Sequence, residues 1–192
     1  MEPWAIALIA VAAVVVLLAV IIVGWYICTH NALVRMKNNV EEAWSTIDIY
    51  LKKRYDLIPN LVETVKGYAK HESETYQKIT DARARLGAAN TTNEKIEADK
   101  QMTAAVRSLF AVVENYPELK ANTNFLDLQN QLKNIEGEIA QSRKYYNATV
   151  REFNIKIQSF PASIVAKKMK LEKASLYEVE NAEERQNVKV SF

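Results

Sequence analysis

The chain of 192 residues has a single cysteine, Cys28, so an intramolecular disulfide is impossible. Its 4 glycines and 4 prolines are few, and its abundant Ala, Leu, Glu, Lys and Gln favour helices throughout. A large excess of positive charge is also missing, and the net charge of +2 excludes a nucleic-acid binder that neutralises many phosphates. Glycine-rich phosphate loops, nucleophile elbows and cysteine clusters do not occur. The sequence therefore predicts no enzyme, no cofactor and no small-molecule substrate.

Charge is completely missing from residues 5–28, which contain no Asp, Glu, Lys, Arg or His. A helix of this length is roughly 36 Å long, which is enough to cross a hydrocarbon core of ~30 Å. Trp4 lies at one end of the run, and Trp25 and Tyr26 lie at the other, as is typical of aromatic residues at membrane interfaces. A cleaved signal peptide is disfavoured because the chain lacks a basic start and the apolar run is too long. We predict an uncleaved anchor, residues 1–29, whose contact with the lipid bilayer is the span at about 5–28.

The flanks of the apolar run predict its orientation. No Lys or Arg precedes it, whereas Arg35 and Lys37 follow it closely. Because cytoplasmic flanks are enriched in these residues, we expect a short N-terminus outside and the remaining domain in the cytoplasm. The prediction is a single-pass protein of the cell membrane.

After the anchor, apolar residues recur at helical spacing in successive segments. The expected helices are residues 32–57, 59–87 and 93–116, and a longer one that runs from Asn122 or Thr123 to Phe160. Similar lengths and short connections are typical of an up-down-up-down bundle. The sequence predicts an all-α fold in which the transmembrane helix is followed by an antiparallel four-helix bundle, residues 30–161.

Pro59 divides the first two of these helices in the prediction. Proline lacks the N–H that an α-helix needs and pushes the preceding residue out of the α region, so it either kinks one long helix or begins a second. The unbroken apolar stripe favours a kink, whereas the similar helix lengths favour a break. We expect the break. The third helix is expected to have Thr92 or Asn93 as its cap, and Asn122 or Thr123 is the expected cap of the fourth.

The fourth helix has the most regular pattern of the chain. Leu128 and Ile135 form a second apolar row beside a strict heptad, and Pro161 ends the helix. Such a seam packs against its neighbours as left-handed coiled coils do. The heptad residues are Phe125, Leu132, Ile139, Tyr146, Phe153 and Phe160.

Residues 162–192 are expected to form a charged, partly mobile tail. In an up-down-up-down order, Phe160 and the basic trio Lys167, Lys168 and Lys170 would lie near the membrane. The trio would then either contact anionic lipid or form an ordinary solvated turn. At the terminus, the alternation in residues 188–192 would let Val188, Val190 and Phe192 dock into a groove or simply fray.

Few polar residues suggest chemistry. His71-Glu72 resembles the start of a helical zinc motif, but Thr75 stands where the second histidine is needed, and His30 is expected to be interfacial. We therefore predict no metal-binding, catalytic or cofactor-binding residue. Arg54 and Arg83 lie on or beside the apolar stripe, where they either snorkel to the bundle edge, pair with buried carboxylates and fix the register, or form part of a partner site. The remaining candidates, expected to cap helices rather than to bind ligands, are Asn115, Asn122 and Asn124.

Several longer segments carry a family resemblance. In chain order they are Asn39-Val40-x-x-Ala43-Trp44-x-x-Ile47-Asp48, residues 56–72 (DLIPNLVETVKGYAKHE), residues 116–125 (YPELKANTNF), Tyr146-Asn147 and Phe160-Pro161. From about Asn31 to Pro161, the chain resembles the LemA family of bacterial membrane proteins, with a weaker likeness in its Val-x-Val-x-Phe end. It departs from the family pattern around residues 169–173.

The resemblance implies an N-terminal membrane helix, a four-helix bundle and no catalytic residues, because the family has no established reaction. Relatives among magnetosome membrane proteins favour a membrane-organising role by analogy. We expect a scaffold that binds other membrane proteins or itself. The alternative is an adaptor or sensor for a soluble or protease partner, and the sequence does not decide between them.

Overall fold

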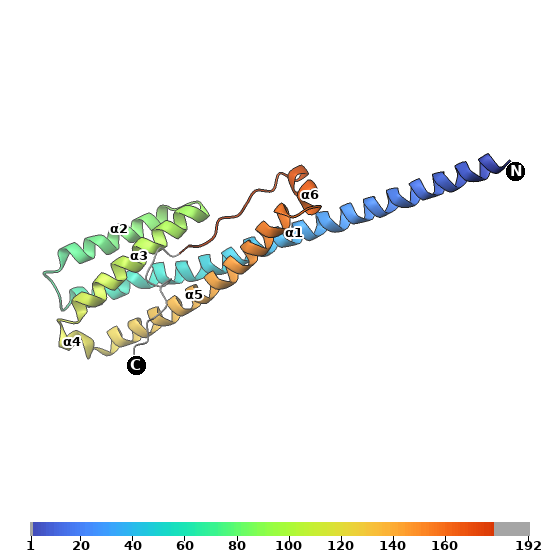
Figure 1. The fold of residues 1–192 in the computed structure, drawn as a ribbon. Coiled ribbons are helices and arrows are strands. Elements are labelled where there is room, and N and C mark those ends of the chain that lie inside the picture. Colours follow the sequence, from blue (N-terminus) through green and yellow to red (C-terminus); the bar gives the residue numbers. More distant parts are fainter. Residues whose placement is uncertain (1, 179–192) are drawn as a thin grey trace, which may run out of the picture. The chain divides into compact units, whose positions relative to one another are not determined.

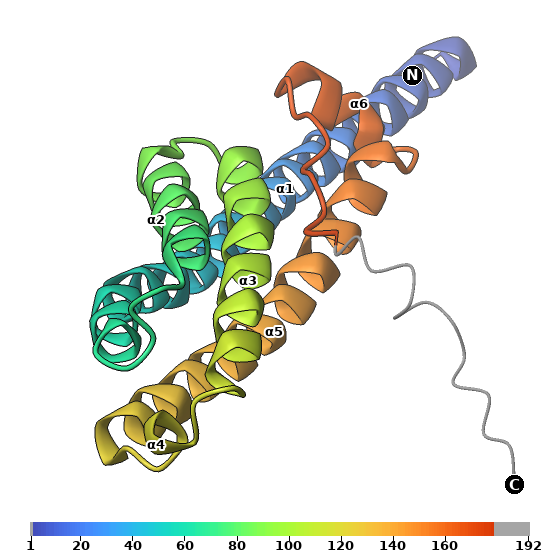
Figure 2. The same ribbon diagram turned by 90° about the vertical axis from the view of Figure 1, so that its left-hand side faces the viewer.

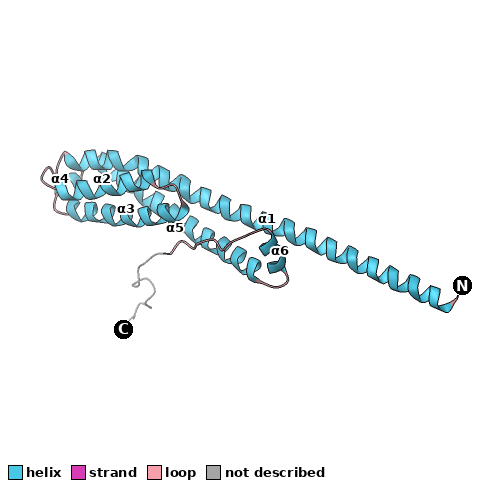
Figure 3. Ribbon diagram, turned by 90° about the horizontal axis from the view of Figure 1, so that it is seen from above, coloured by secondary structure: helices cyan, strands magenta, loops and turns pink. Residues whose placement is uncertain are grey.

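The computed structural model of the protein describes residues 2–178, and within that range every regular element is a helix (Figures 1 and 3). The predicted all-α class is therefore confirmed. The elements are α1 (Pro3–Lys66), α2 (Ser73–Ala88), α3 (Thr92–Val113), α4 (Pro117–Lys120), α5 (Thr123–Gln158) and α6 (Ala162–Lys168).

The predicted break at Pro59 is wrong, because α1 runs through this residue and ends at Lys66. Pro59 has no N–H for the carbonyl of Tyr55 one turn earlier. Arg83 of α2 supplies the missing donor: its Nε lies 3.3 Å from the Tyr55 oxygen, and its guanidinium carbon lies 4.0 Å from the centre of the Tyr55 ring. The helix can therefore continue because a side chain replaces the backbone hydrogen bond that proline removes. The second expected helix is shorter than predicted and begins only at Ser73.

The chain divides into two compact units. Among the described residues, the anchor unit combines those up to Glu42 with Ala148–Ala174, and the bundle unit combines Ala43–Asn147 with residues 175–178. Each unit joins segments that are distant in sequence, whereas the expected domains of residues 1–29, 30–161 and 162–192 follow the sequence and stay a prediction.

The bundle unit has one continuous apolar core to which α1, α2, α3, α4 and α5 all contribute. In it α2 and α3 lie side by side (Figure 2). Thr91, one residue before the expected positions, is the N-cap of α3, where it forms a capping box with Glu94. Asn122 caps α5 as predicted, because its Oδ1 accepts a hydrogen bond from the Phe125 N–H at 3.0 Å.

The heptad row of α5 is buried as predicted at five of its six positions, Phe125, Leu132, Ile139, Tyr146 and Phe153. Phe160 is the exception and is exposed, because α5 ends at Gln158 and the chain turns into α6.

The anchor unit contains the apolar part of α1, and α6 lies beside α1 (Figure 1). Leu33 of α1 packs with Phe153 and Ile157 of α5 and with Val165 and Ala166 of α6. The large apolar side chains described between Leu8 and Val23 are all exposed. This helix is long and apolar enough to cross a membrane, which is consistent with the predicted anchor.

Candidate functional site

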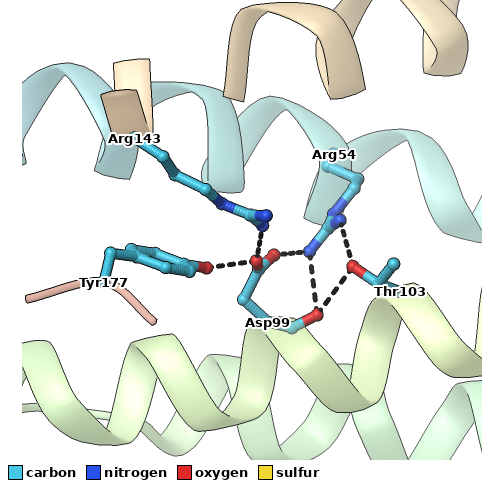
Figure 4. A network of polar contacts seen from close by, with 5 residues as sticks. All are labelled: Arg54, Asp99, Thr103, Arg143 and Tyr177. Atoms are coloured by element: carbon cyan, nitrogen blue, oxygen red, sulfur yellow. Dashed lines mark hydrogen bonds and ion pairs between the residues drawn. The ribbon is translucent and has the colours of Figure 1, made fainter. Parts of the chain in front are cut away.

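The most unusual site in the bundle unit is a group of charged side chains in its interior, shown in Figure 4. Arg54 of α1 is 1% exposed and Asp99 of α3 is 0% exposed. Their side chains form an ion pair from Arg54 Nη2 to Asp99 Oδ1. Arg54 therefore does not snorkel to the surface, and the alternative expectation, pairing with a buried carboxylate, is confirmed.

Two further side chains reach the other oxygen of the same carboxylate. Arg143 of α5 and the hydroxyl of Tyr177 both donate to Asp99 Oδ2. The guanidinium carbon of Arg143 also lies 4.4 Å from the centre of the Tyr177 ring. We call Arg54, Asp99, Arg143 and Tyr177 the buried charge cluster.

Thr103 completes the surroundings of Arg54. Its hydroxyl accepts a hydrogen bond from Arg54 Nη1 at 3.1 Å and donates one to the Asp99 carbonyl at 2.9 Å. Both partners come from the same face of α3, one turn apart. Arg54 is thus fixed against one short stretch of α3, which sets the register between α1 and α3.

The protonation states of the cluster follow from its burial. Burial lowers the pKa of Arg54 to about 10, so the guanidinium keeps its charge at neutral pH. Burial also raises the pKa of Tyr177, against the opposing effect of the two arginines, so the phenol is neutral and donates to the carboxylate. Two guanidinium charges therefore surround one carboxylate, and neither Arg54 nor Tyr177 exchanges a proton near pH 7. The arrangement is suited to holding helices together rather than to proton transfer.

Tyr177 reaches the cluster because the chain after α6 is attached to the bundle. The side-chain amide of Asn147 forms two hydrogen bonds with the backbone of Tyr177, accepting from its N–H at 2.7 Å and donating to its carbonyl at 2.9 Å. Tyr146 donates to the Ser175 carbonyl at 3.0 Å, and the ring of Trp44 contacts those of Tyr146 and Tyr177. This part of the expected tail is held in place, whereas the predicted docking of Val188, Val190 and Phe192 lies outside the described residues.

Sequence reasoning found Arg54 and missed the other three members. Asp99 and Arg143 could have been found from the sequence, because the helical spacing places each of these charged residues among buried apolar positions. The indication for Tyr177 was weaker, namely that it is one of two aromatic residues in the segment 162–192.

The other sequence candidates lie apart from the cluster. Arg83 is half-buried and serves the carbonyl of Tyr55. His71 is exposed on the connection between α1 and α2, and residues 2–178 contain no group of three or more His, Cys, Asp or Glu arranged to hold a metal ion. The absence of catalytic, cofactor and metal residues stays a prediction, as does the capping role of Asn115 and Asn124.

A pocket of about 340 Å³ opens between α1 and the α2–α3 connection. Lys52 and Lys95 line it, and each forms an ion pair, Lys52 with Asp56 and Lys95 with Asp48 at 2.6 Å. Because its cations are neutralised by their neighbours, the pocket gives no reason to assign a charged ligand to it.

Comparison with known proteins gives a consistent result. The model of the LemA family matches residues 43–192. Protein LemA of Metamycoplasma hominis is 28% identical over 82% of this chain and 73% of its own length. Magnetosome protein MamQ 2 of Paramagnetospirillum magneticum is 23% identical over 79% of this chain, and MamQ of Magnetospirillum gryphiswaldense is 22% identical over 80%. The chain spans about two thirds of these two magnetosome proteins, 65% and 66% of their lengths.

Proposed function

The chain belongs to the LemA family, and on this premise we propose that it is a membrane-anchored helical scaffold that organises assemblies of membrane proteins without catalysing a reaction. The observation that carries the proposal is the buried charge cluster. Its charged and polar groups are turned toward one another and tie α1, α3, α5 and the segment around Tyr177 into one arrangement. Such a bundle is suited to presenting a fixed surface.

Exposed apolar side chains on the bundle unit supply the surface that a scaffold needs. Ile49 on α1 is 57% exposed and Tyr145 on α5 is 61% exposed. Large apolar side chains of this kind are the anchors of protein interfaces. The two relatives named as magnetosome proteins support the same proposal, since their names state a structure to which they belong and no reaction.

The proposed location is the cell membrane, crossed once, with the N-terminus outside and the bundle unit in the cytoplasm. The apolar part of α1 supports the crossing, and Arg35 and Lys37 support the orientation. A second candidate function is an adaptor or sensor for a soluble or protease partner. The attachment of the Tyr177 segment through side chains favours it, because release of that segment would change the bundle surface.

Photo-cross-linking in native membranes tests both candidates. A benzophenone amino acid is placed at Ile49 or at Tyr145 of the full chain, and Lys144, which is exposed and polar, serves as the control position. Adducts with the chain itself or with other membrane proteins, formed at the apolar positions and not at Lys144, are expected for a scaffold. Adducts with one soluble protein instead would support the adaptor. Equal labelling at all three positions would contradict both.

A further inference from the structure

The turn after α5 and the outer face of α6 expose large apolar side chains. Phe160 is 82% exposed and Ile164 is 57% exposed, although Ala162, Val165 and Ala166 close to them in the chain are buried. Val165 and Ala166, on the other face of α6, lie in the apolar cluster around Leu33. Burial of its inner face therefore holds α6 in place, while Phe160 and Ile164 point away from the protein.

The part of α1 against which α6 packs indicates how far α6 lies from the hydrocarbon core of a membrane. Lys168 Nζ lies 5.1 Å from the centre of the Tyr26 ring, and Val165 packs in the cluster that contains Leu33. Tyr26 stands at the end of the apolar run, and the seven residues from it to Leu33 cover about 10 Å of helix. The polar headgroup region on one side of a bilayer is about 5–7 Å thick. When α1 crosses a bilayer, the Lys168 end of α6 consequently lies at the level of the headgroups.

The charge of this segment complements an anionic surface. Residues 153–171 contain no Asp or Glu, and their charged residues are four lysines. Three of them, Lys167, Lys168 and Lys170, are exposed at the end of α6 or directly after it. Lysines that lie beside the end of a membrane span are attracted to anionic lipid. The four are Lys156, Lys167, Lys168 and Lys170.

We propose that Phe160 and Ile164 insert into the headgroup region of an anionic bilayer while Lys167, Lys168 and Lys170 contact lipid phosphates. We call these five residues the α6 surface. Apolar side chains next to lysines are the pattern by which interfacial helices bind membranes. The α6 surface adds to the membrane anchor a second contact with the bilayer, and the strength of this contact depends on the content of anionic lipid. It is independent of whether the bundle unit binds partners, so it goes beyond the proposed scaffold.

Spin labelling of the full chain tests the depth of the α6 surface. Cys28→Ala removes the native thiol, and Phe160→Cys or Ile164→Cys then carries a nitroxide label. The control is Leu126→Cys, an exposed apolar position on α5 that is separated from Gln158 by roughly 48 Å of helix. Each protein is reconstituted in phosphatidylcholine vesicles, with or without phosphatidylglycerol. Accessibility to oxygen, which partitions into lipid, is compared with accessibility to a water-soluble nickel complex.

We expect the labels at positions 160 and 164 to favour oxygen over nickel in the phosphatidylglycerol vesicles, and the label at 126 to favour nickel. Preference for nickel at 160 and 164 in both vesicles would overturn the insertion. Low accessibility to both reagents would also overturn it, because a second copy of the chain would then cover these residues. Equal insertion with and without phosphatidylglycerol would overturn the role of anionic lipid.

A charge variant isolates the lysines. Lys167→Gln, Lys168→Gln and Lys170→Gln are combined with the label at position 160, and the control combines Lys70→Gln, Lys133→Gln and Lys144→Gln, three exposed lysines elsewhere in the chain. The first set is expected to remove the difference between the two vesicle compositions, and the control set to leave it unchanged. Equal behaviour of the two sets would contradict the lipid contact.

Discussion

Asp99 is the residue on which the buried charge cluster depends, since its carboxylate forms ion pairs with the guanidinium groups of both Arg54 and Arg143. Two cations held close together in an interior of low dielectric repel one another strongly when this carboxylate is missing. The same residue links three elements, because its partners come from α1, α5 and the segment around Tyr177. Its contribution is therefore both energetic and geometric.

Asp99→Asn is expected to lower the free energy of unfolding of the bundle by about 3–5 kcal/mol, since it leaves the buried guanidinium of Arg54 without its ion pair. Urea unfolding of the full chain in detergent, followed by far-UV circular dichroism, measures the loss. Asp127→Asn is the matched control, because Asp127 is exposed and its replacement is expected to change stability by less than about 0.5 kcal/mol. Equal effects of the two substitutions would show that the cluster does not stabilise the bundle.

Tyr177→Phe removes one buried hydrogen bond and is expected to lower the free energy of unfolding by about 1–3 kcal/mol at neutral pH.

Tyr177 also makes the free energy of unfolding depend on pH. Because burial raises its pKa, its contribution is complete below the ordinary tyrosine value of about 10 and is lost as pH rises through the raised value. The difference in stability between the native chain and Tyr177→Phe should therefore shrink above about pH 10. Tyr145→Phe, at an exposed tyrosine, is the control, and a difference that stays constant up to strongly alkaline pH would contradict the assignment.

At the scale of elements, α1 is the unusual one, because it is a helix of 64 residues that contains a proline. Removal of an i to i−4 hydrogen bond ordinarily kinks or breaks a helix. Here α2 lies where Arg83 can donate to the carbonyl of Tyr55, so the pairing of two helices preserves one of them. The uninterrupted α1 carries the chain from the apolar run into the bundle unit.

A double-mutant cycle between Pro59 and Arg83 tests this compensation. Arg83→Met in the native chain should lower stability by about 1–3 kcal/mol, because the Tyr55 carbonyl loses its donor. In the background of Pro59→Ala, residue 59 has its own N–H for that carbonyl, so the same substitution should cost less, with a coupling of at least about 0.5 kcal/mol. Arg85→Met, which removes an exposed hydrogen bond to Gln101, should show no coupling with position 59. Additive effects of Pro59→Ala and Arg83→Met would contradict the compensation.

At the scale of the whole molecule, the orientation of the chain in the membrane is the property with the widest consequences. It decides whether partners of the bundle are found in the cytoplasm or outside. In the background of Cys28→Ala, Glu2→Cys is expected to react with a membrane-impermeant maleimide in intact cells, whereas Lys133→Cys should react only after the membrane is opened. The reverse pattern would place the bundle outside.

Local patterns in the sequence determined the all-α class, the apolar run of residues 5–28, the buried face of α5 and the cap at Asn122. These features depend on residues within one or two turns of each other, where periodicity and capping chemistry act. The continuation of α1 through Pro59 was decided by the tertiary structure, because the donor that permits it is 28 residues away. The same holds for the buried charge cluster, because Arg143 lies 44 residues and Tyr177 78 residues after Asp99 in the chain. Packing alone brings such groups together, and the cost of burying a charge then requires that they pair.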